Sequence, residues 1–234
     1  MPYRMWIPSD VADSRHIWCS MGFKTPDEKE IQRLNRLQQE RFDGLVDLFE
    51  PPLQEDVPER LETIVAAAAI RSGEAVLDVG TGTGILVPII QTYGPGRIFA
   101  CDLSGEMLKQ LRKNYSGVET ILSDVRDLTL PEESVNVVFI NACYPNIVDK
   151  AGAFENIARM MRPAGRVVIS HPLGKRFVDT LRQNSPFPFD DFPDASEVDR
   201  LFSPYGFTFE SLVDEPELYI LKISRRPTQT KTDR

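Results

Sequence analysis

The sequence is poor in the residue types that bind metal ions or build disulfide frameworks. Its 234 residues include only two histidines, at positions 16 and 171, and three cysteines, at positions 19, 101 and 143. Two separated histidines are too few for a metal cluster, and an odd number of scattered cysteines is typical of reduced thiols in a cytosolic protein. We therefore expect a cytoplasmic protein with no metal site and no disulfide framework.

Basic residues are also scarce relative to acidic ones. The 35 aspartates and glutamates outnumber the 27 lysines and arginines, so the net charge is −8. Because a nucleic-acid groove needs a basic face, this balance argues against nucleic acid as a partner. No apolar run is long enough for a membrane span, and the stretch Met1–Trp6 shows no hydrophobic region of a signal peptide.

The most informative stretch that is present is Val76–Gly84. A short apolar run that contains Asp78 is followed by glycines at alternate positions, Gly80, Gly82 and Gly84. The run predicts a buried strand, and glycine permits positive φ and the close approach of a ligand. With the apolar helix predicted next, the stretch indicates a ligand site at the carboxyl end of a parallel sheet.

The spacing of these glycines narrows the class of ligand. A dinucleotide fingerprint counted from Gly80 would need its third glycine at Ile85, and one counted from Gly82 would need it at Val87. A phosphate loop would need a lysine, which is absent here. The pattern Asp-x-Gly-x-Gly-x-Gly instead resembles the first motif of class I S-adenosylmethionine-dependent methyltransferases. The alternative is a glycine-rich turn that binds nothing.

The rest of the chain predicts an α/β fold. Strands and helices alternate, which favours parallel βαβ units in a doubly wound sheet. The last two strands are joined by only four residues, so they must form an antiparallel hairpin. We expect a mostly parallel seven-stranded sheet of the Rossmann-like methyltransferase type. Its strands are Ala75–Val79, Arg97–Asp102, Val118–Leu122, Val135–Ile140, Arg166–Ser170, Phe207–Val213 and Leu218–Ser224, and its helices are Gly84–Thr92, Ser104–Lys113 and Lys150–Met161.

We expect a single domain over residues 1–234. Residues 1–72 form an arm and a helical cap, residues 73–224 the Rossmann-like core, and residues 225–234 a disordered tail. The cap begins at about Thr25, a plausible N-cap followed by Pro26, and a second helix starts near Pro58. The first 25 residues hold both tryptophans and either pack across the domain, cover a pocket or bind a partner.

The family resemblance implies a binding site for S-adenosylmethionine. The glycine motif would hold the methionine part, and Asp102, which ends a strand 22 residues after Gly80, would accept hydrogen bonds from the ribose hydroxyls. The alternatives are a structural acid at Asp102 and ordinary core side chains at two of the other positions, Leu103 and Met107. The full set of expected cofactor-binding residues is Asp78, Gly80, Thr81, Gly82, Gly84, Asp102, Leu103, Met107, Asp124, Val125 and Asn141.

The segment Asn141–Asn146 follows the fourth strand, where the family resemblance places the transferred methyl group. Asn141 and Tyr144 match the ends of the Asn/Asp-Pro-Pro-Tyr motif of amino-directed enzymes, but Ala142 and Cys143 replace its prolines. The stretch 137–170 looks closer to the ubiquinone/menaquinone-type C-methyltransferases and their small-molecule relatives. Cys143 is expected to pack rather than to act as a nucleophile, since no partner base is evident.

Two residues are candidates for catalytic roles. His171 ends the fifth strand and could accept a proton from the methyl acceptor, or could be a hydrogen-bonded turn histidine. Tyr144 could favour the cationic cofactor through its ring. The proline- and phenylalanine-rich stretch 185–193 is either a lid or a structural crossover loop.

The sequence therefore predicts an S-adenosylmethionine-dependent enzyme that methylates a small molecule at carbon or oxygen by in-line displacement. The alternatives are a protein or RNA acceptor, or a domain that binds the cofactor without turnover. A homodimer is a possible assembly.

Overall fold

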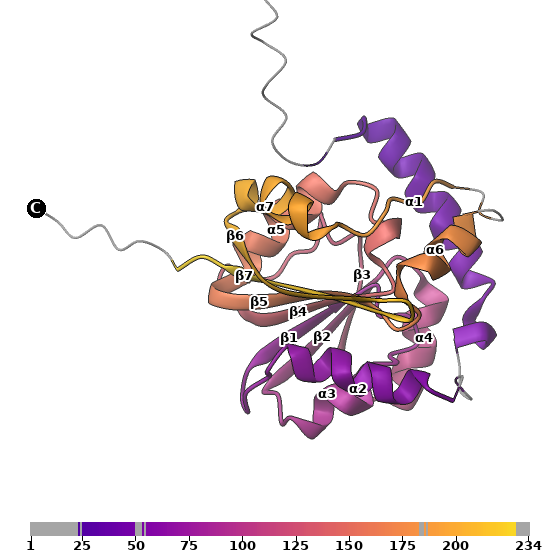
Figure 1. Cartoon of the computed structure of the whole chain (residues 1–234). Coiled ribbons are helices and arrows are strands. Elements are labelled where there is room, and N and C mark those ends of the chain that lie inside the picture. The colour runs from indigo at the N-terminus through magenta and orange to yellow at the C-terminus, as the bar shows by residue number, and fades with distance from the viewer. Residues whose placement is uncertain are drawn as a thin grey trace, which may run out of the picture.

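The computed structural model describes residues 23, 25–49, 53, 55–182, 185 and 187–227. Seven strands form one sheet in the order β3-β2-β1-β4-β5-β7-β6, with helices on both faces (Figure 1). The strands are β1 (Ala75–Val79), β2 (Arg97–Asp102), β3 (Glu119–Leu122), β4 (Val135–Asn141), β5 (Met161–His171), β6 (Phe207–Glu215) and β7 (Leu218–Arg225). The helices are α1 (Glu28–Asp43), α2 (Val57–Ala67), α3 (Val87–Thr92), α4 (Gly105–Asn114), α5 (Lys150–Met160), α6 (Gly174–Arg182) and α7 (Ala195–Phe202).

The pairing of the strands confirms the predicted fold class. Strands β1 to β5 are mutually parallel, and β7 pairs antiparallel with both β5 and β6. The hairpin of β6 and β7 is joined by the two residues between Glu215 and Leu218. This is the doubly wound sheet with a terminal antiparallel hairpin that the spacing of apolar segments indicated.

Alternation along the central strands divides the core into two layers. Leu77 and Val79 of β1 pack with side chains of α5 and α7 on one face. Val76, one position away, packs with side chains of α2 and α3 on the other face. Because successive strand residues point to opposite faces, a strand buried on both sides reads as a continuous apolar run.

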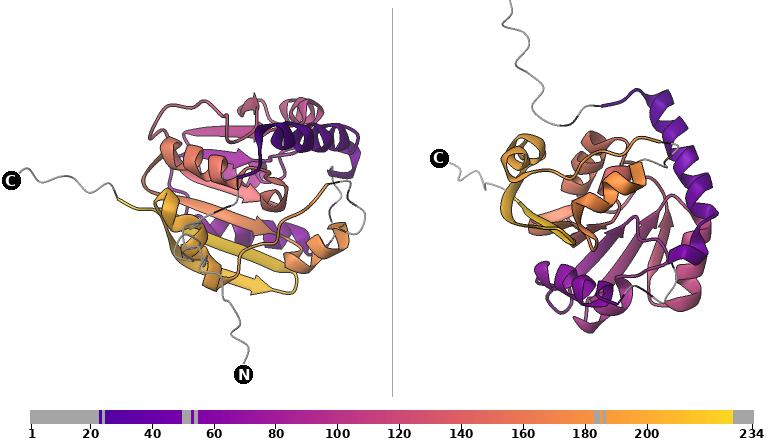
Figure 2. Two further views of the ribbon diagram at one scale, coloured as in Figure 1. Left: turned by 90° about the horizontal axis from the view of Figure 1, so that it is seen from above. Right: turned by 45° about the vertical axis from the view of Figure 1, so that its right-hand side comes forward.

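Helix α1, which lies in the region predicted to be a cap, crosses the sheet edge at which the first strands end (Figure 2). Its contacts fix this position. Asn35 reaches the loop after β3, Gln38 the loop after β4, and Asp43 the residue Ser104 after β2. The cap therefore lies over the edge of the sheet where parallel α/β folds bind their ligands.

Several local predictions were wrong. Asp27, not Thr25, caps α1, because its carboxylate accepts a hydrogen bond from the backbone N–H of Glu30 at 3.0 Å. Helix α3 begins at Val87 instead of Gly84, because the glycine turn continues through residue 84. Strand β5 begins five residues early, with residues 162–165 forming an irregularity in its pairing with β4. Helix α7 was not predicted as an element of the fold.

Other local predictions hold. The hydroxyl of Ser104 caps α4 by accepting a hydrogen bond from the backbone N–H of Met107 at 3.1 Å. The aromatic arm predicted before residue 23 and the last seven residues of the predicted tail lie outside the described residues. Among the helices that the structure describes, none combines the length and the apolar character needed to cross a membrane.

Candidate functional site

The glycine turn after β1 has the backbone conformation that its sequence predicts. Gly80, Gly82 and Gly84 all have positive φ, at 63°, 55° and 92°. A Cβ added at Gly80 would lie 2.2 Å from the Sγ of Cys143, whereas one added at Gly82 would meet nothing within 4 Å. The turn is therefore packed against the loop after β4 at its first glycine and open at its second.

Asp78 lies beneath this turn and is 2% exposed. Its Oδ2 accepts a hydrogen bond from the hydroxyl of Thr81 at 2.7 Å. Burial raises the pKa of Asp78 to about 7, and the nearby charge of Asp102 adds to this, while the Thr81 hydrogen bond opposes it. The carboxylate thus has one uncharged hydrogen-bond partner and little contact with solvent.

Asp102 at the end of β2 closes onto the glycine turn. Its Oδ2 accepts from the backbone N–H of Gly82 and its Oδ1 from that of Ser104, both at 2.8 Å. Burial raises the pKa of Asp102, against the effect of these backbone N–H groups. Of the two expected adenine neighbours, Leu103 is half-buried and Met107 is only 2% exposed.

These two acids suit a cationic ligand with hydroxyl groups. Within the described part of the chain, neither Asp78 nor Asp102 forms an ion pair, so a positive charge placed beside them would relieve the cost of their burial. Each Asp102 oxygen can accept a further hydrogen bond. S-adenosylmethionine, which the sequence resemblance implies, carries an ammonium, a sulfonium and two ribose hydroxyls, and the residues present fit it.

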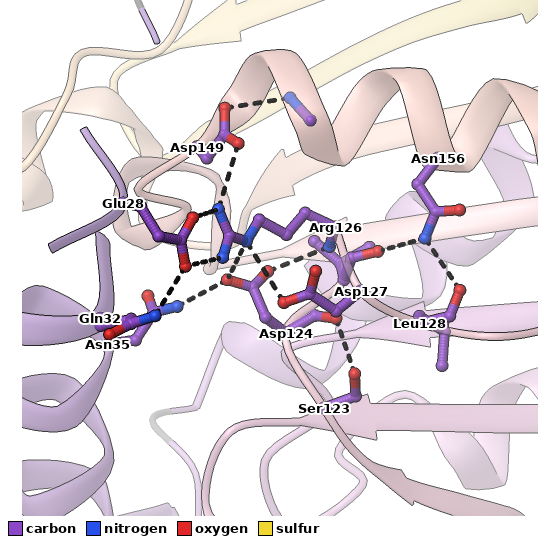
Figure 3. A network of polar contacts seen from close by, with 12 residues as sticks. Glu28, Gln32, Asn35, Ser123, Asp124, Arg126, Asp127, Leu128, Asp149 and Asn156 are labelled. Carbon is purple, nitrogen blue, oxygen red and sulfur yellow. Dashed lines mark hydrogen bonds and ion pairs between the residues drawn. The ribbon is translucent and has the colours of Figure 1, made fainter. Parts of the chain in front are cut away.

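Asp124, the expected adenine-binding acid, belongs to a network that joins the loop after β3 to α1 (Figure 3). Its Oδ2 accepts from Asn35 of α1 at 2.6 Å, and its Oδ1 accepts from the backbone N–H of Arg126 at 3.0 Å. Burial raises the pKa of Asp124. Val125 is buried, and its carbonyl accepts from the side chain of Asn156.

Arg126 is the centre of this network. Its guanidinium donates to both oxygens of Glu28, at 2.8 and 2.9 Å, and its Nε donates to Asp127 at 3.2 Å (Figure 3). Asp149 lies 3.6 Å away and Asp124 3.8 Å away. Since the side chain is only 15% exposed, these carboxylates meet a partly desolvated cation, and the first turn of α1 is fixed to the loop that carries Asp124.

We expect the replacement Arg126→Gln to lower the free energy of unfolding by about 2 kcal/mol, because it leaves the carboxylates of Asp124 and Asp149, whose side chains are 14% and 8% exposed, without their cation. Arg97→Gln is the matched control. Arg97 donates to both oxygens of Glu119, but both side chains are more than half exposed, so its loss should cost at most about 1 kcal/mol. Urea unfolding of both variants at pH 7 measures the difference. Equal effects would contradict a special role of burial at Arg126.

The loop after β4 brings together the residues that were expected to lie near the methyl acceptor. Asn141 is 8% exposed, and its Oδ1 accepts from the hydroxyl of Ser170 at 2.9 Å. The thiol of Cys143 lies against Gly80, and burial raises its pKa above the ordinary thiol value. Tyr144 is 2% exposed, its ring stacks on Phe192, and the Lys150 ammonium lies 4.9 Å from its ring centre.

His171 ends β5 and is 5% exposed. Burial lowers the pKa of His171 to about 4, so the imidazole is neutral at pH 7. Its Nδ1 accepts from the backbone N–H of Leu173 at 3.1 Å, which places the ring proton on Nε2. Phe177 and Phe192 lie against the ring.

Sequence reasoning missed the residues that close the site from other elements. Asn35, Gln38 and Asp43 of α1 reach the loops after three different strands. Lys150, only 4% exposed, bonds to Asp190 of the stretch 187–193 at 2.5 Å. The polar residues of α1 could have been singled out, because they interrupt its apolar face, but their partners are far away in sequence.

The central part of the chain is similar to known methyltransferases. Residues 77–169 match the family model described as a methyltransferase domain. The arsenite methyltransferase of Halobacterium salinarum is 36% identical over 133 residues, which are 53% of this chain and 32% of that protein. The ubiquinone/menaquinone biosynthesis C-methyltransferase of Vibrio campbellii is 27% identical over 163 residues, 65% of this chain and 62% of that protein. The chain thus spans less than two thirds of these relatives.

A solved structure agrees with the fold. A methyltransferase of Haloferax volcanii, determined in complex with the activator Trm112, superposes with a TM-score of 0.67 at 18% identity. The match covers 86% of this chain and 99% of that one. At this identity the likeness concerns the fold.

Proposed function

We propose that this chain, whose residues 77–169 form a class I S-adenosylmethionine-dependent methyltransferase domain, is an enzyme. It transfers the methyl group of S-adenosylmethionine to a small molecule, at carbon or oxygen. When bound, the cofactor supplies a methyl carbon on a sulfonium, from which an acceptor nucleophile displaces S-adenosylhomocysteine in line. The observation that carries the proposal is the pair of carboxylates, the buried Asp78 and the partly buried Asp102, set around an open glycine turn.

In this proposal the chain binds and orients both reactants. Asp102 accepts the ribose hydroxyls, Asp78 balances the positive charge beneath the turn, and the open face at Gly82 admits the ligand. Asp124 and Val125 bind the adenine, with Leu103 and Met107 at its ring and with Thr81, Gly84 and Asn141 completing the site. Alignment of this kind, with water excluded, can remove several kcal/mol from the barrier.

His171 is the proposed proton acceptor and Tyr144 the proposed aromatic neighbour of the reacting groups. The neutral imidazole of His171 is the form that a base requires. Its Nδ1 is engaged by Leu173, so accepting a proton requires that this hydrogen bond open or that the ring change tautomer. Tyr144 would act through its ring, since burial raises the pKa of its hydroxyl.

The observed side chains favour an organic acceptor over arsenite. Capture of trivalent arsenic uses thiols that lose their protons, whereas burial raises the pKa of both described thiols, Cys101 and Cys143. The described residues also contain no group of three or more metal-binding side chains.

The free thiols of Cys101 and Cys143 support a reducing, cytoplasmic location. A homodimer is the proposed assembly.

Calorimetric titration with S-adenosylmethionine and S-adenosylhomocysteine tests the proposal. We expect the native chain to bind both, and Asp102→Ala to weaken both at least about 30-fold, because two hydroxyl-to-carboxylate hydrogen bonds are lost. Asp199→Ala, which removes an exposed carboxylate on α7, is the matched control and should bind like the native chain. Failure of the native chain to bind either compound would contradict the proposed function. Transfer of label from the cofactor to phenols or hydroquinones then distinguishes an enzyme from a binding domain.

A further inference from the structure

Helix α1 and the short turn after it contact the loops that follow each of the strands β1 to β4. Four hydrogen bonds make these contacts: Thr83 Oγ1 to the carbonyl of Phe49 at 3.1 Å, Ser104 Oγ to Asp43 Oδ1 at 2.5 Å, Asn35 Nδ2 to Asp124 Oδ2 at 2.6 Å and Gln38 Nε2 to the carbonyl of Asn146 at 2.8 Å. The same four loops carry the residues proposed to bind the cofactor. One segment of the chain therefore spans the whole proposed site.

Of these four bonds, the one at Asn35 engages a side chain that the proposed function assigns to the adenine. Asn35 donates to Asp124 Oδ2, and the backbone N–H of Arg126 donates to Oδ1 at 3.0 Å (Figure 3). The Nε of Arg126 lies 3.8 Å from Oδ2, and the Asp124 side chain is only 14% exposed. Because both oxygens already have a donor and meet little solvent, a donor that arrives from outside has to compete for Oδ2.

The two donors to Asp124 differ in how easily they can leave. The N–H of Arg126 belongs to the same loop, two positions further on, so its bond is part of a backbone turn. Asn35 lies 89 positions earlier, on a separate helix, and its half-buried side chain can rotate away without breaking a backbone bond. Its amide is an uncharged NH₂ donor, as is the amino group of adenine. Asn35 is therefore the donor that adenine can replace.

We propose that Asn35 is an internal competitor of the adenine amino group, whose amide holds Asp124 Oδ2 when no cofactor is bound and releases it when the adenine enters. The inference rests on the proposed function, which places the adenine at Asp124. The contact keeps a poorly solvated carboxylate paired, which would otherwise be costly. Because one amide-type donor replaces another, the amino group adds little net affinity in the native chain. Asn35 thereby lowers the affinity for the cofactor and for its product alike.

A calorimetric comparison of two ligands tests this role without turnover. The full chain is titrated with S-adenosylhomocysteine and with its 6-deamino analogue, whose purine carries hydrogen in place of the amino group. Asn35→Ala should bind S-adenosylhomocysteine about 10-fold more tightly than the native chain, because no hydrogen bond to a carboxylate has to be broken first. Its affinity for the deamino analogue should not rise, so its preference for the amino group should grow about 10-fold.

Gln38→Ala is the matched control. It also removes a bond between α1 and a loop of the site, but it leaves the pair of Asn35 and Asp124 in place. A general loosening of the helix affects both ligands by the same factor. The preference of Gln38→Ala for the amino group should therefore equal that of the native chain.

The outcomes separate the inference from its premise. If the native chain fails to bind S-adenosylhomocysteine, the proposed function fails and the inference fails with it. If the native chain binds but Asn35→Ala binds S-adenosylhomocysteine equally or more weakly, Asn35 does not compete and the inference alone is overturned. Equal tightening of both ligands in Asn35→Ala would also overturn it, because the effect would then come from the helix as a whole. Native affinity of Asn35→Ala for the deamino analogue shows that the variant is folded.

Discussion

Replacing Asp78 by asparagine is expected to make the cofactor-free protein more stable at pH 8, although the residue belongs to the proposed binding site. Burial raises the folded-state pKa of Asp78 from its ordinary value of 3.8 to about 7. The stability that its protonated form provides is complete below pH 3.8 and is lost as the pH rises through about 7. The corresponding free energy is roughly 4 kcal/mol, and asparagine, which does not titrate, keeps it at every pH.

The measurement is urea unfolding of the native chain and of Asp78→Asn between pH 4 and pH 8. We expect the stability of the variant relative to the native chain to grow by roughly 4 kcal/mol over this range. The amide oxygen can still accept from Thr81, so the turn should remain folded. Asp199→Asn, on the exposed face of α7, is the matched control and should show no such trend. A difference in stability that does not change with pH would contradict the raised pKa of Asp78.

The same titration links stability to ligand binding. A cationic ligand beside Asp78 favours the ionised carboxylate, so its binding at pH 6.5 should release up to about one proton. Calorimetry of S-adenosylmethionine binding in two buffers of different ionisation enthalpy measures this proton. Asp78→Asn should bind more weakly and should release less. Equal release by both proteins would place the titrating group elsewhere, with Asp102 the next candidate because its pKa is also raised.

The sequence predicted the sheet and the glycine turn because both leave local patterns. Strand β1 is an apolar run that only Asp78, near its end, interrupts, and both of its faces are buried. The short link between the last two strands excludes a crossover helix, so the hairpin followed from length alone. The family resemblance drawn from Val76–Gly84 is confirmed by the domain match over residues 77–169.

The closing contacts could not be predicted, because they join residues that are distant along the chain. Asn35 and Asp124 are 89 positions apart, and Gln38 and Asn146 are 108 apart. No local pattern encodes such a pair, and its existence depends on where the fold places α1. Helix α7 is a different case. Its capping box, formed by Asp194 and Glu197, was visible as a local signal next to the apolar positions of the helix.

The replacement Gly80→Ala is expected to lower the free energy of unfolding by about 2–5 kcal/mol. Alanine is strained by about 1–2 kcal/mol at a φ of 63°, and overpacking of a close-packed interior adds about 1–3 kcal/mol. Here the added Cβ would lie 2.2 Å from the Sγ and 2.7 Å from the Cβ of Cys143. Gly82→Ala is the matched control, because its φ is 55° and an added Cβ meets nothing within 4 Å, so only the backbone strain applies.

The variant Cys143→Gly separates the two contributions, because it removes both atoms that the alanine at position 80 would strike. In the double variant, the cost of the steric clash, about 1–3 kcal/mol, should be absent, whereas the backbone strain should remain. The double variant should therefore be more stable than the sum of the two single effects predicts, and this difference is the coupling energy. Urea unfolding of the two single variants and the double variant gives this coupling directly. Additive effects, or equal losses in Gly80→Ala and Gly82→Ala, would contradict it. A measured coupling would mean that Gly80 is required by contact with the loop after β4, so that the cofactor turn and the acceptor segment of the proposed enzyme form one packed unit.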